Sequence, residues 1–316
     1  MIDLQYVGVA NNIILSNIIN TFILNTIMTK LEFIEIKNKF LNHLKNSQKS
    51  MHTQKSYLLD LEQILNLWNT YEERDQDTQN NIDLEQILLI YLESLNSSNI
   101  SSSSIARKIS CINSFKKFLL SMDITINIKP KRPVVILKDP LTLDPEDISI
   151  ILDLVDTKNF HTKSPYRDKA IMQLLYTTGI LCSEITQIEI NHIDFKSNTI
   201  IVRSKNKRER IVTFSNKASK YISLYIDSER VKIKNNTEKL FLNKNNTPLG
   251  IRSIQRICQM FKVYLADNKL LTPNILRNSF ASHMLKNGAN INKMQELLGH
   301  KTKISTIRYI SKKSDL

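Results

Sequence analysis

Apolar residues in the first third of the chain recur at spacings of three and four, which places them on one face of a helix. This pattern covers residues 31–44, 57–68, 84–91 and 105–119. Serines occupy residues 101–104, just before the last of these segments. Serine favours the N-cap because its hydroxyl accepts a hydrogen bond from a free backbone N–H. The sequence therefore predicts a small helical bundle.

A cluster of prolines follows this helical region. Four of the seven prolines in the chain lie close together, at Pro130, Pro133, Pro140 and Pro145. Proline fixes φ and removes a hydrogen-bond donor, so we interpret residues 129–141 as a linker. The chain then divides into a helical domain at 28–128 and a second domain at 142–316.

The second domain combines helical periodicity with two short β-type runs. Helices are expected around the following segments: 143–154, 170–176, 221–231, 251–265, 273–286 and 291–298. Residues 199–203 and 210–214 are rich in β-branched side chains and flank a polar turn, which predicts a hairpin. The predicted fold class is mainly α, with an N-terminal helical bundle and a C-terminal mixed α+β domain that holds a small antiparallel sheet.

The first 27 residues differ from the rest of the chain. They are apolar but interrupted by polar residues, and Asp3 is their only charge, so the basic start of a signal peptide is missing. A clear amphipathic pattern begins only at Met28. We expect residues 1–27 to be an extension outside the fold and Met28 to be an alternative start. No stretch is long enough for a transmembrane helix, so we expect a cytoplasmic protein with no membrane partner.

The charge balance narrows the class of partner. The chain has 44 Lys and Arg against 30 Asp and Glu, a formal charge of +14. Such an excess favours a polyanionic partner, although a Lys-rich composition from an AT-rich genome is an alternative. The three cysteines, Cys111, Cys182 and Cys258, lack metal-ligand spacing. We therefore expect a reducing compartment, no metal and no cofactor.

Two basic segments are candidates for contact with nucleic acid. Four basic side chains, Arg107, Lys108, Lys116 and Lys117, lie on the predicted helix at 105–119. The hairpin turn adds Lys207, Arg208 and Arg210. Lys and Arg in such positions bind DNA phosphates, whereas the alternative is that both segments are solvated surfaces.

Several ordered motifs in the second domain resemble those of the tyrosine recombinase or phage integrase family, closest to its Xer branch, over roughly residues 30–310. The motifs are the run from Leu174 to Glu184, the hairpin run Ser204-Lys205-Asn206-Lys207-Arg208-Glu209-Arg210, Leu276-Arg277, Leu298-Gly299-His300, and Tyr309. The resemblance implies a SAM-like core-binding domain and a catalytic domain that close as a C-shaped clamp on double-stranded DNA. It also implies a tetramer on DNA, either of this chain alone or with a second recombinase.

The resemblance assigns a chemical role to each of these residues. Tyr309 would attack the scissile phosphate and form a 3′-phosphotyrosyl link, so that bond energy is kept for rejoining. Lys205 would protonate the departing 5′-oxygen, and Arg277 and His300 would hold the non-bridging oxygens. Glu184 would orient its neighbours.

Three departures from the family pattern weaken this assignment. Leu181 stands where the family has its first phosphate-binding arginine, and Asn274 stands where a histidine is usual. An amide can donate to a phosphate but cannot shuttle a proton. Only seven residues follow Tyr309, too few for the C-terminal helix that is usual in the Xer branch.

These departures leave alternatives open. The chain is either an active recombinase, in chromosome dimer resolution or mobile-element integration and excision, or a catalytically impaired DNA-binding descendant or inactive partner subunit. A type IB topoisomerase shares the chemistry. A helical DNA-binding regulator would explain the charge but not the spacing of Arg277, His300 and Tyr309.

Overall fold

The computed structural model describes residues 28–74, 82–136, 139–154, 162–204, 209–231 and 237–310. The chain divides into two compact units between residues 137 and 138, and each unit is described by itself. The predicted extension at 1–27, the hairpin turn at 205–208 and the tail at 311–316 lie outside the described residues.

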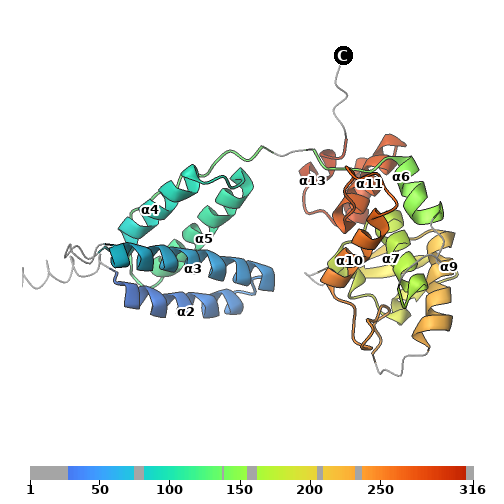
Figure 1. Cartoon of the computed structure of the whole chain (residues 1–316), viewed down its shortest axis with the longest axis horizontal. Coiled ribbons are helices and arrows are strands. Elements are labelled where there is room, and N and C mark those ends of the chain that lie inside the picture. Colours follow the sequence, from blue (N-terminus) through green and yellow to red (C-terminus); the bar gives the residue numbers. More distant parts are fainter. Residues whose placement is uncertain are drawn as a thin grey trace, which may run out of the picture. The chain divides into compact units, whose positions relative to one another are not determined.

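The first unit consists of helices around an aromatic core (Figure 1). Its described helices are α2 (Lys30–Asn46), α3 (Met51–Arg74), α4 (Leu84–Ser97) and α5 (Ser102–Leu120). Phe33 is fully buried against Trp68 and Phe115. Ser101 is the N-cap of α5, as expected from the serine run, and its side chain accepts from the N–H of Ser104. The prediction of a helical N-terminal domain is confirmed.

A buried polar network corrects one of the predicted DNA contacts. Lys108 is only 8% exposed, and its ammonium donates to Asp60 at 3.2 Å, to the Tyr91 hydroxyl at 3.1 Å and to Gln63. Arg107 donates from both Nη atoms to the Asp60 carboxylate. The ammonium group of Lys108 therefore points into the interior of the unit, away from the surface that could meet DNA. There it balances the buried charge of Asp60, whose other cation, Arg107, is more exposed.

The other two basic residues of α5 differ from each other. Lys116 donates to the backbone carbonyl of Ile128, which fixes the segment after the helix. Lys117 is exposed. Of the four basic residues predicted on this helix, Lys117 is the most exposed to solvent, and Arg107 is exposed in part.

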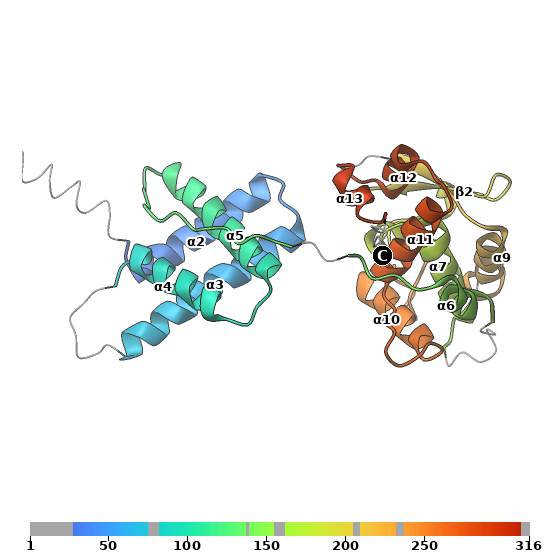
Figure 2. The ribbon, with the colours of Figure 1, turned by 90° about the horizontal axis from the view of Figure 1, so that it is seen from above.

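The second unit surrounds a central helix with further helices and a small sheet (Figure 2). In chain order, its described elements are α6 (Pro145–Ser149), the π-helix η1 (Ile150–Leu154), α7 (Pro165–Thr178), α8 (Cys182–Ile185), the short 3₁₀ helix η3 (Ile190–His192), β1 (Ile193–Asp194), β2 (Thr199–Arg203), β3 (Glu209–Thr213), α9 (Asn216–Leu224), the π-helix η4 (Tyr225–Arg230), α10 (Ile251–Lys262), α11 (Pro273–Lys286), α12 (Ile291–Leu298) and α13 (Ile304–Ile307).

The predicted hairpin is the larger part of an antiparallel sheet with the order β1-β2-β3. Val202 on β2 pairs with Arg210 on β3. On β3, Arg210 and Val212 are less exposed than their neighbours, so these two side chains share the inward face. The small antiparallel sheet of the predicted fold class is confirmed, and the two-residue strand β1 is an addition to it.

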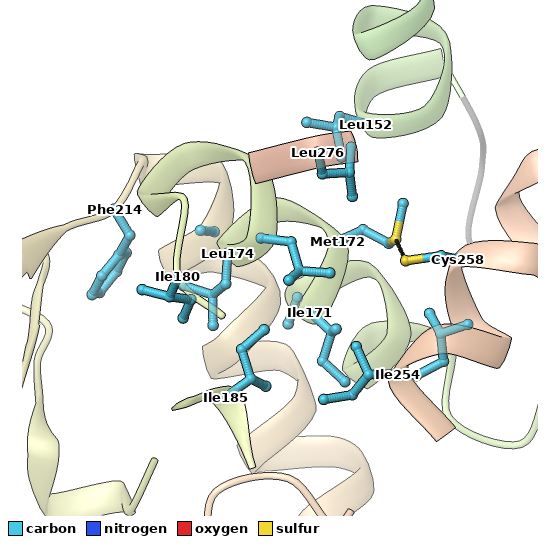
Figure 3. Close-up of a cluster of buried hydrophobic side chains, with 14 of the residues drawn as sticks. Leu152, Ile171, Met172, Leu174, Ile180, Ile185, Phe214, Ile254, Cys258 and Leu276 are labelled. Carbon is cyan, nitrogen blue, oxygen red and sulfur yellow. Dashed lines mark hydrogen bonds between the residues drawn. The ribbon is translucent and has the colours of Figure 1, made fainter. Parts of the chain in front are cut away.

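Helix α7 occupies the centre of the second unit and is buried on nearly all sides. Figure 3 shows Ile171, Met172 and Leu174 of α7 among side chains from several other elements. Cys258 of α10 lies with its sulfur 3.8 Å from the Met172 sulfur. This packing fixes the end of α7, from which the candidate site begins.

The end of α7 requires glycine. Gly179 has φ of +61°, the left-handed conformation that closes many helices. A Cβ at this position would lie 2.5 Å from a ring carbon of Phe280 on α11. The close approach places residues 180–184 beside α11, and no larger residue fits there without displacing the aromatic ring.

No helix within the described ranges of either unit has both the length and the apolar character needed to cross a membrane.

We predict that Asp60→Asn destabilises the first unit strongly. It leaves Lys108 as a buried cation without a full counterion, which costs about 3 kcal/mol of unfolding free energy. The control is Lys117→Gln on the exposed face of α5, where we expect a change within about 0.5 kcal/mol. Urea unfolding of both variants checks this, and equal midpoints for Asp60→Asn and wild type would show that the network contributes nothing.

Candidate active site

Arg277 lies at the centre of the candidate site. Thr272 caps α11 and Pro273 begins it, which brings Arg277 into the second turn. Its side chain is buried, and its guanidinium donates to the Gly179 carbonyl at 2.5 Å, to the Leu298 carbonyl at 2.6 Å and to His300 Nε2 at 3.0 Å. The side chain of Arg277 therefore links the end of α7, the end of α12 and His300.

His300 is held from both ring nitrogens. The left-handed Gly299, with φ of +68°, ends α12 and turns the chain so that His300 faces Arg277. Its Nδ1 lies 2.8 Å from the hydroxyl of the fully buried Thr306. Arginine can only donate, so Nε2 accepts, and the ring proton is assigned to Nδ1, facing Thr306. The sequence interpretation missed Thr306, because its contact with His300 exists only in the folded structure.

Burial affects the charge state of His300 and the solvation of Arg277. Burial lowers the pKa of His300 to about 4, and the charges of Arg277, Arg210 and Arg308 add to this shift. Burial also lowers the pKa of Arg277, while Tyr309 and Glu184 act in the opposite direction and favour its charged form. An arginine stays charged at neutral pH even so. The site therefore holds a permanent cation beside an uncharged imidazole.

Tyr309 completes this group. It follows α13 and is 8% exposed, with its ring stacked on that of His300 at 6.0 Å between centroids and 17° between planes. Tyr309 also lies close enough to Arg277 to favour the charged form of the guanidinium. The structure thus brings together Arg277, His300 and Tyr309, which are separated by up to 32 residues in the chain.

Glu184 and Arg210 form an ion pair next to this group. Arg210 donates from Nη1 and Nη2 to the two carboxylate oxygens of Glu184, at 2.6 and 2.9 Å, and from Nε to the Leu297 carbonyl at 2.7 Å. The side chain of Arg210 therefore points inward from β3, and its predicted contact with DNA stays a prediction. The signal was present in the strand alternation, since Arg210 shares a face with Val212 and Phe214.

The departures from the family pattern lie in different places. Leu181 is 39% exposed and lines an open depression of about 840 Å³. Asn274 is exposed on α11 and is not among the residues that line this depression. The described lining consists of Leu181, Ser183, Glu184, Ser204, Glu209, Arg210, Arg277, Gln295, Glu296, Leu298, Gly299, His300 and Lys301.

The predicted hairpin residues Lys205, Lys207 and Arg208 lie outside the described residues. Ser204 and Glu209, which flank them in the chain, both line the depression. The described lining carries three cations and three carboxylates, and the turn adds three further cations in sequence. No cluster of three or more metal-binding side chains occurs in the parts of the chain that the structure describes.

The geometry suits chemistry at a phosphate. A phenol is stacked on a neutral imidazole, and the guanidinium groups of Arg210 and Arg277 line the same depression, where they can stabilise negative charge on non-bridging oxygens. These donors are fixed by backbone carbonyls and a carboxylate, so little reorganisation is needed when charge develops.

We predict that His300 makes the second unit less stable in acid. Its folded pKa of about 4 lies below its ordinary value of 6.5, so the unfolded chain binds the proton more readily. Stability therefore falls as the pH drops through this window, by about 1–2 kcal/mol after allowance for solvent screening.

The measurement is denaturant unfolding of wild type and His300→Gln at several pH values from 7 to about 4. The wild type should lose more stability than the variant over this range. Parallel losses in the two proteins would mean that His300 does not titrate in this environment.

Comparisons with known proteins agree over both units. The family profile described as Phage integrase family matches residues 142–315, and the profile described as Phage integrase, N-terminal SAM-like domain, matches residues 38–122. Tyrosine recombinase XerD of Staphylococcus haemolyticus (strain JCSC1435) is 35% identical over 215 residues, which cover 66% of this chain and 72% of that protein.

Solved structures show the same fold at lower identity. The XerH site-specific recombinase bound to palindromic difH substrate, in a post-cleavage complex, has a TM-score of 0.70 and 17% identity, covering 89% of this chain and 92% of that one. A lambda integrase dimer bound to a COC′ core site has a TM-score of 0.64 and 14% identity, covering 96% of this chain and 82% of that one.

Proposed function

The chain belongs to the phage integrase family of tyrosine recombinases, and we propose that it cuts and rejoins double-stranded DNA at specific sites through a covalent link to Tyr309. The observation that carries this proposal is the convergence of Arg277, His300 and Tyr309 around one buried guanidinium. A chain that had lost its chemistry would not need to keep a phenol, an imidazole and a guanidinium in mutual contact.

The proposed reaction is a transfer of one phosphodiester bond. The phenolic oxygen of Tyr309 attacks phosphorus, the bond from phosphorus to the 5′-oxygen breaks, and a 3′-phosphotyrosyl link forms. The phenolic proton of Tyr309 passes to solvent, and Lys205 gives a proton to the departing 5′-oxygen. The new link keeps the bond energy, so the reverse attack by a 5′-hydroxyl reseals DNA without another energy source.

Arg277 stabilises the charge that develops on the non-bridging oxygens. Its donors are already oriented by two carbonyls, as required of a group that must act at the moment of reaction. Neutral His300 helps to orient this guanidinium, because its Nε2 accepts from Arg277 at 3.0 Å.

Two observations support DNA binding: the net charge of the chain and the similarity of its fold to recombinases that were solved with DNA. The chain has a net charge of +14, and the similar XerH and lambda integrase structures are described as bound to DNA. We assign phosphate contacts to Lys117 and Arg107 in the first unit and to Lys207 and Arg208 in the hairpin turn. A clamp around duplex DNA, and a tetramer on paired sites with this chain alone or with a second recombinase, complete the proposed assembly.

The cellular role follows from where the recognised site occurs. Similarity to XerD favours chromosome dimer resolution, and integration or excision of a mobile element is the other role open to this fold. One recognition sequence per chromosome would indicate the first role, and sequences at the ends of an element the second.

A second candidate function rests on Leu181. Its side chain carries no donor and no charge at the position of the family's first phosphate-binding arginine. A chain impaired in this way would serve as a DNA-binding partner in a mixed tetramer whose other subunits cut. Covalent trapping separates the two functions.

We predict a covalent complex between the protein and a nicked duplex. The duplexes carry the sequence that the protein itself selects from a random pool, with a nick one position beyond each successive phosphate, so that a cleaved fragment diffuses away. A slower band on a denaturing gel, lost in Tyr309→Phe, is the expected result, since phenylalanine lacks the nucleophilic oxygen.

Two controls make the result specific. Tyr176→Phe removes a hydroxyl of the same unit, which hydrogen-bonds His283 at 3.0 Å, and should leave the covalent band in place. Gel-shift binding by Tyr309→Phe should match that of wild type. Binding without a covalent band in the wild type would contradict the proposed reaction and favour the partner subunit function.

A further inference from the structure

Position 181 is where the candidate site lacks a cation. Leu181 directly precedes α8, and its backbone N–H donates to Glu184 Oε2 at 2.8 Å. Its side chain lies at the wall of the depression that also contains Arg277 and His300. A phosphate held there by Arg277 would meet a hydrocarbon on this side unless another residue supplies the charge.

Arg210 reaches the same corner from the sheet. Its Nη2 donates to Glu184 Oε2 at 2.9 Å, and this is the carboxylate oxygen that also accepts from Leu181. The guanidinium therefore lies one carboxylate oxygen away from the backbone of residue 181. The charge of Arg210 thus lies close to the backbone from which an arginine at position 181 would extend.

The end of α12 fixes two guanidinium groups with consecutive carbonyls. Arg210 donates to the Leu297 carbonyl at 2.7 Å, and Arg277 donates to the Leu298 carbonyl at 2.6 Å. The C-terminal end of a helix carries negative partial charge and favours cations. This shared anchor places the two arginines next to each other although they come from β3 and α11.

Gly299 provides the space for this arrangement. A Cβ on Gly299 would lie 3.2 Å from Arg210 Nη1 and 3.4 Å from Cζ. The guanidinium thus packs directly on the backbone that leads to His300. Arg210 is tied to the same turn as the residues that would perform the chemistry.

Arg210 retains donors for a ligand. A guanidinium has five N–H groups, and the described contacts use one each on Nε, Nη1 and Nη2. One N–H on each Nη atom is left. The side chain is 14% exposed and lines the depression.

We propose that Arg210 is the second phosphate-binding cation of the site and takes the place of the arginine that is absent at position 181. This inference rests on the proposed function. Arg210 and Arg277 together hold the non-bridging oxygens of the scissile phosphate, and Glu184 is a positioning residue that fixes the Arg210 fork. Two guanidinium charges and one carboxylate leave a single positive charge, which matches the charge of a phosphodiester.

The rival explanation is that Arg210 only neutralises Glu184. Glu184 is 5% exposed, and a buried carboxylate without a partner is strongly unfavourable. Loss of Arg210 would then reduce activity through misfolding. The test must therefore separate charge on the phosphate from charge on Glu184.

The first arm uses the nicked duplex of the preceding section. Arg210→Gln should lower the rate of covalent complex formation by about 10²–10³-fold. The matched control is Arg203→Gln, which breaks the exposed Arg203–Glu209 pair at 2.6 Å on the neighbouring strand. We expect the control to stay within about threefold of wild type, because exposed pairs contribute little.

The second arm changes the phosphate. A methylphosphonate at the scissile position replaces one non-bridging oxygen with a methyl group and removes the negative charge; each diastereomer is tested. The defect of Arg210→Gln should shrink to about tenfold or less on one of them, since the cation is no longer required. An equal defect on the charged and neutral duplexes would overturn the proposal.

The third arm removes the unpaired carboxylate. The double variant Arg210→Gln, Glu184→Gln recovers stability but should still cleave slowly, whereas recovered cleavage would show that Arg210 acts only on Glu184. Adding Leu181→Arg to this double variant should restore cleavage. This variant also keeps the test decisive if Arg210→Gln alone does not fold.

The outcomes separate the inference from the function on which it rests. A wild-type chain that forms no covalent complex overturns both. A complex that depends on Tyr309 but forms equally fast in wild type and Arg210→Gln overturns only the assignment of Arg210.

Discussion

One buried guanidinium organises the candidate active site. Arg277 donates to the carbonyl after α7, to the carbonyl that ends α12, and to His300, so three segments that are distant in the chain meet on one side chain. The contacts are obligatory, because buried carbonyls that lose their donor cost about 1–3 kcal/mol each. The same donors set the direction of the charge that would stabilise a reacting phosphate. Folding of this region and preparation of the site for chemistry are therefore one process, and the neutral state of His300 and the placement of Tyr309 follow from it.

The charge balance of the site determines what chemistry it can perform. His300 is neutral because it is buried and lies near cations, and in that state its Nε2 accepts from Arg277. Leu181 removes a charge from one wall of the depression, while Arg210 brings one to the same corner through Glu184. The end of α12 is the common support, since its last two carbonyls each bind one arginine. In this view the departure at position 181 changes which element supplies the cation, and the number of cations is kept.

Local patterns were sufficient to predict most of the elements, and tertiary contacts explain what was missed. Ser101, Gly179 and the β-branched runs act on their own neighbours, so the α5 start, the α7 end and the hairpin could be predicted from sequence. The meeting of Arg277, His300 and Tyr309 followed only from the resemblance to a family, because their contacts join distant segments. The burial of Lys108 could not be predicted from its neighbours in the sequence, because its partner Asp60 lies 48 residues away. The inward direction of Arg210 could have been predicted, because the alternation along β3 places it on the same face as Val212. Helix α6 has its N-cap at Asp144 and begins at Pro145, inside the segment 143–154 that was expected to be helical.

The central claim is that Arg277 holds the ends of α7 and α12 and the following turn in a prepared arrangement. Amide hydrogen exchange of Arg277→Gln against wild type tests it directly, because exchange reports local opening segment by segment. The account predicts faster exchange in residues 179–185 and 298–309, with little change in helices α2 to α5 of the first unit. Unchanged protection in residues 298–309 would contradict it, since the turn that carries His300 and Tyr309 would then be held in place without Arg277.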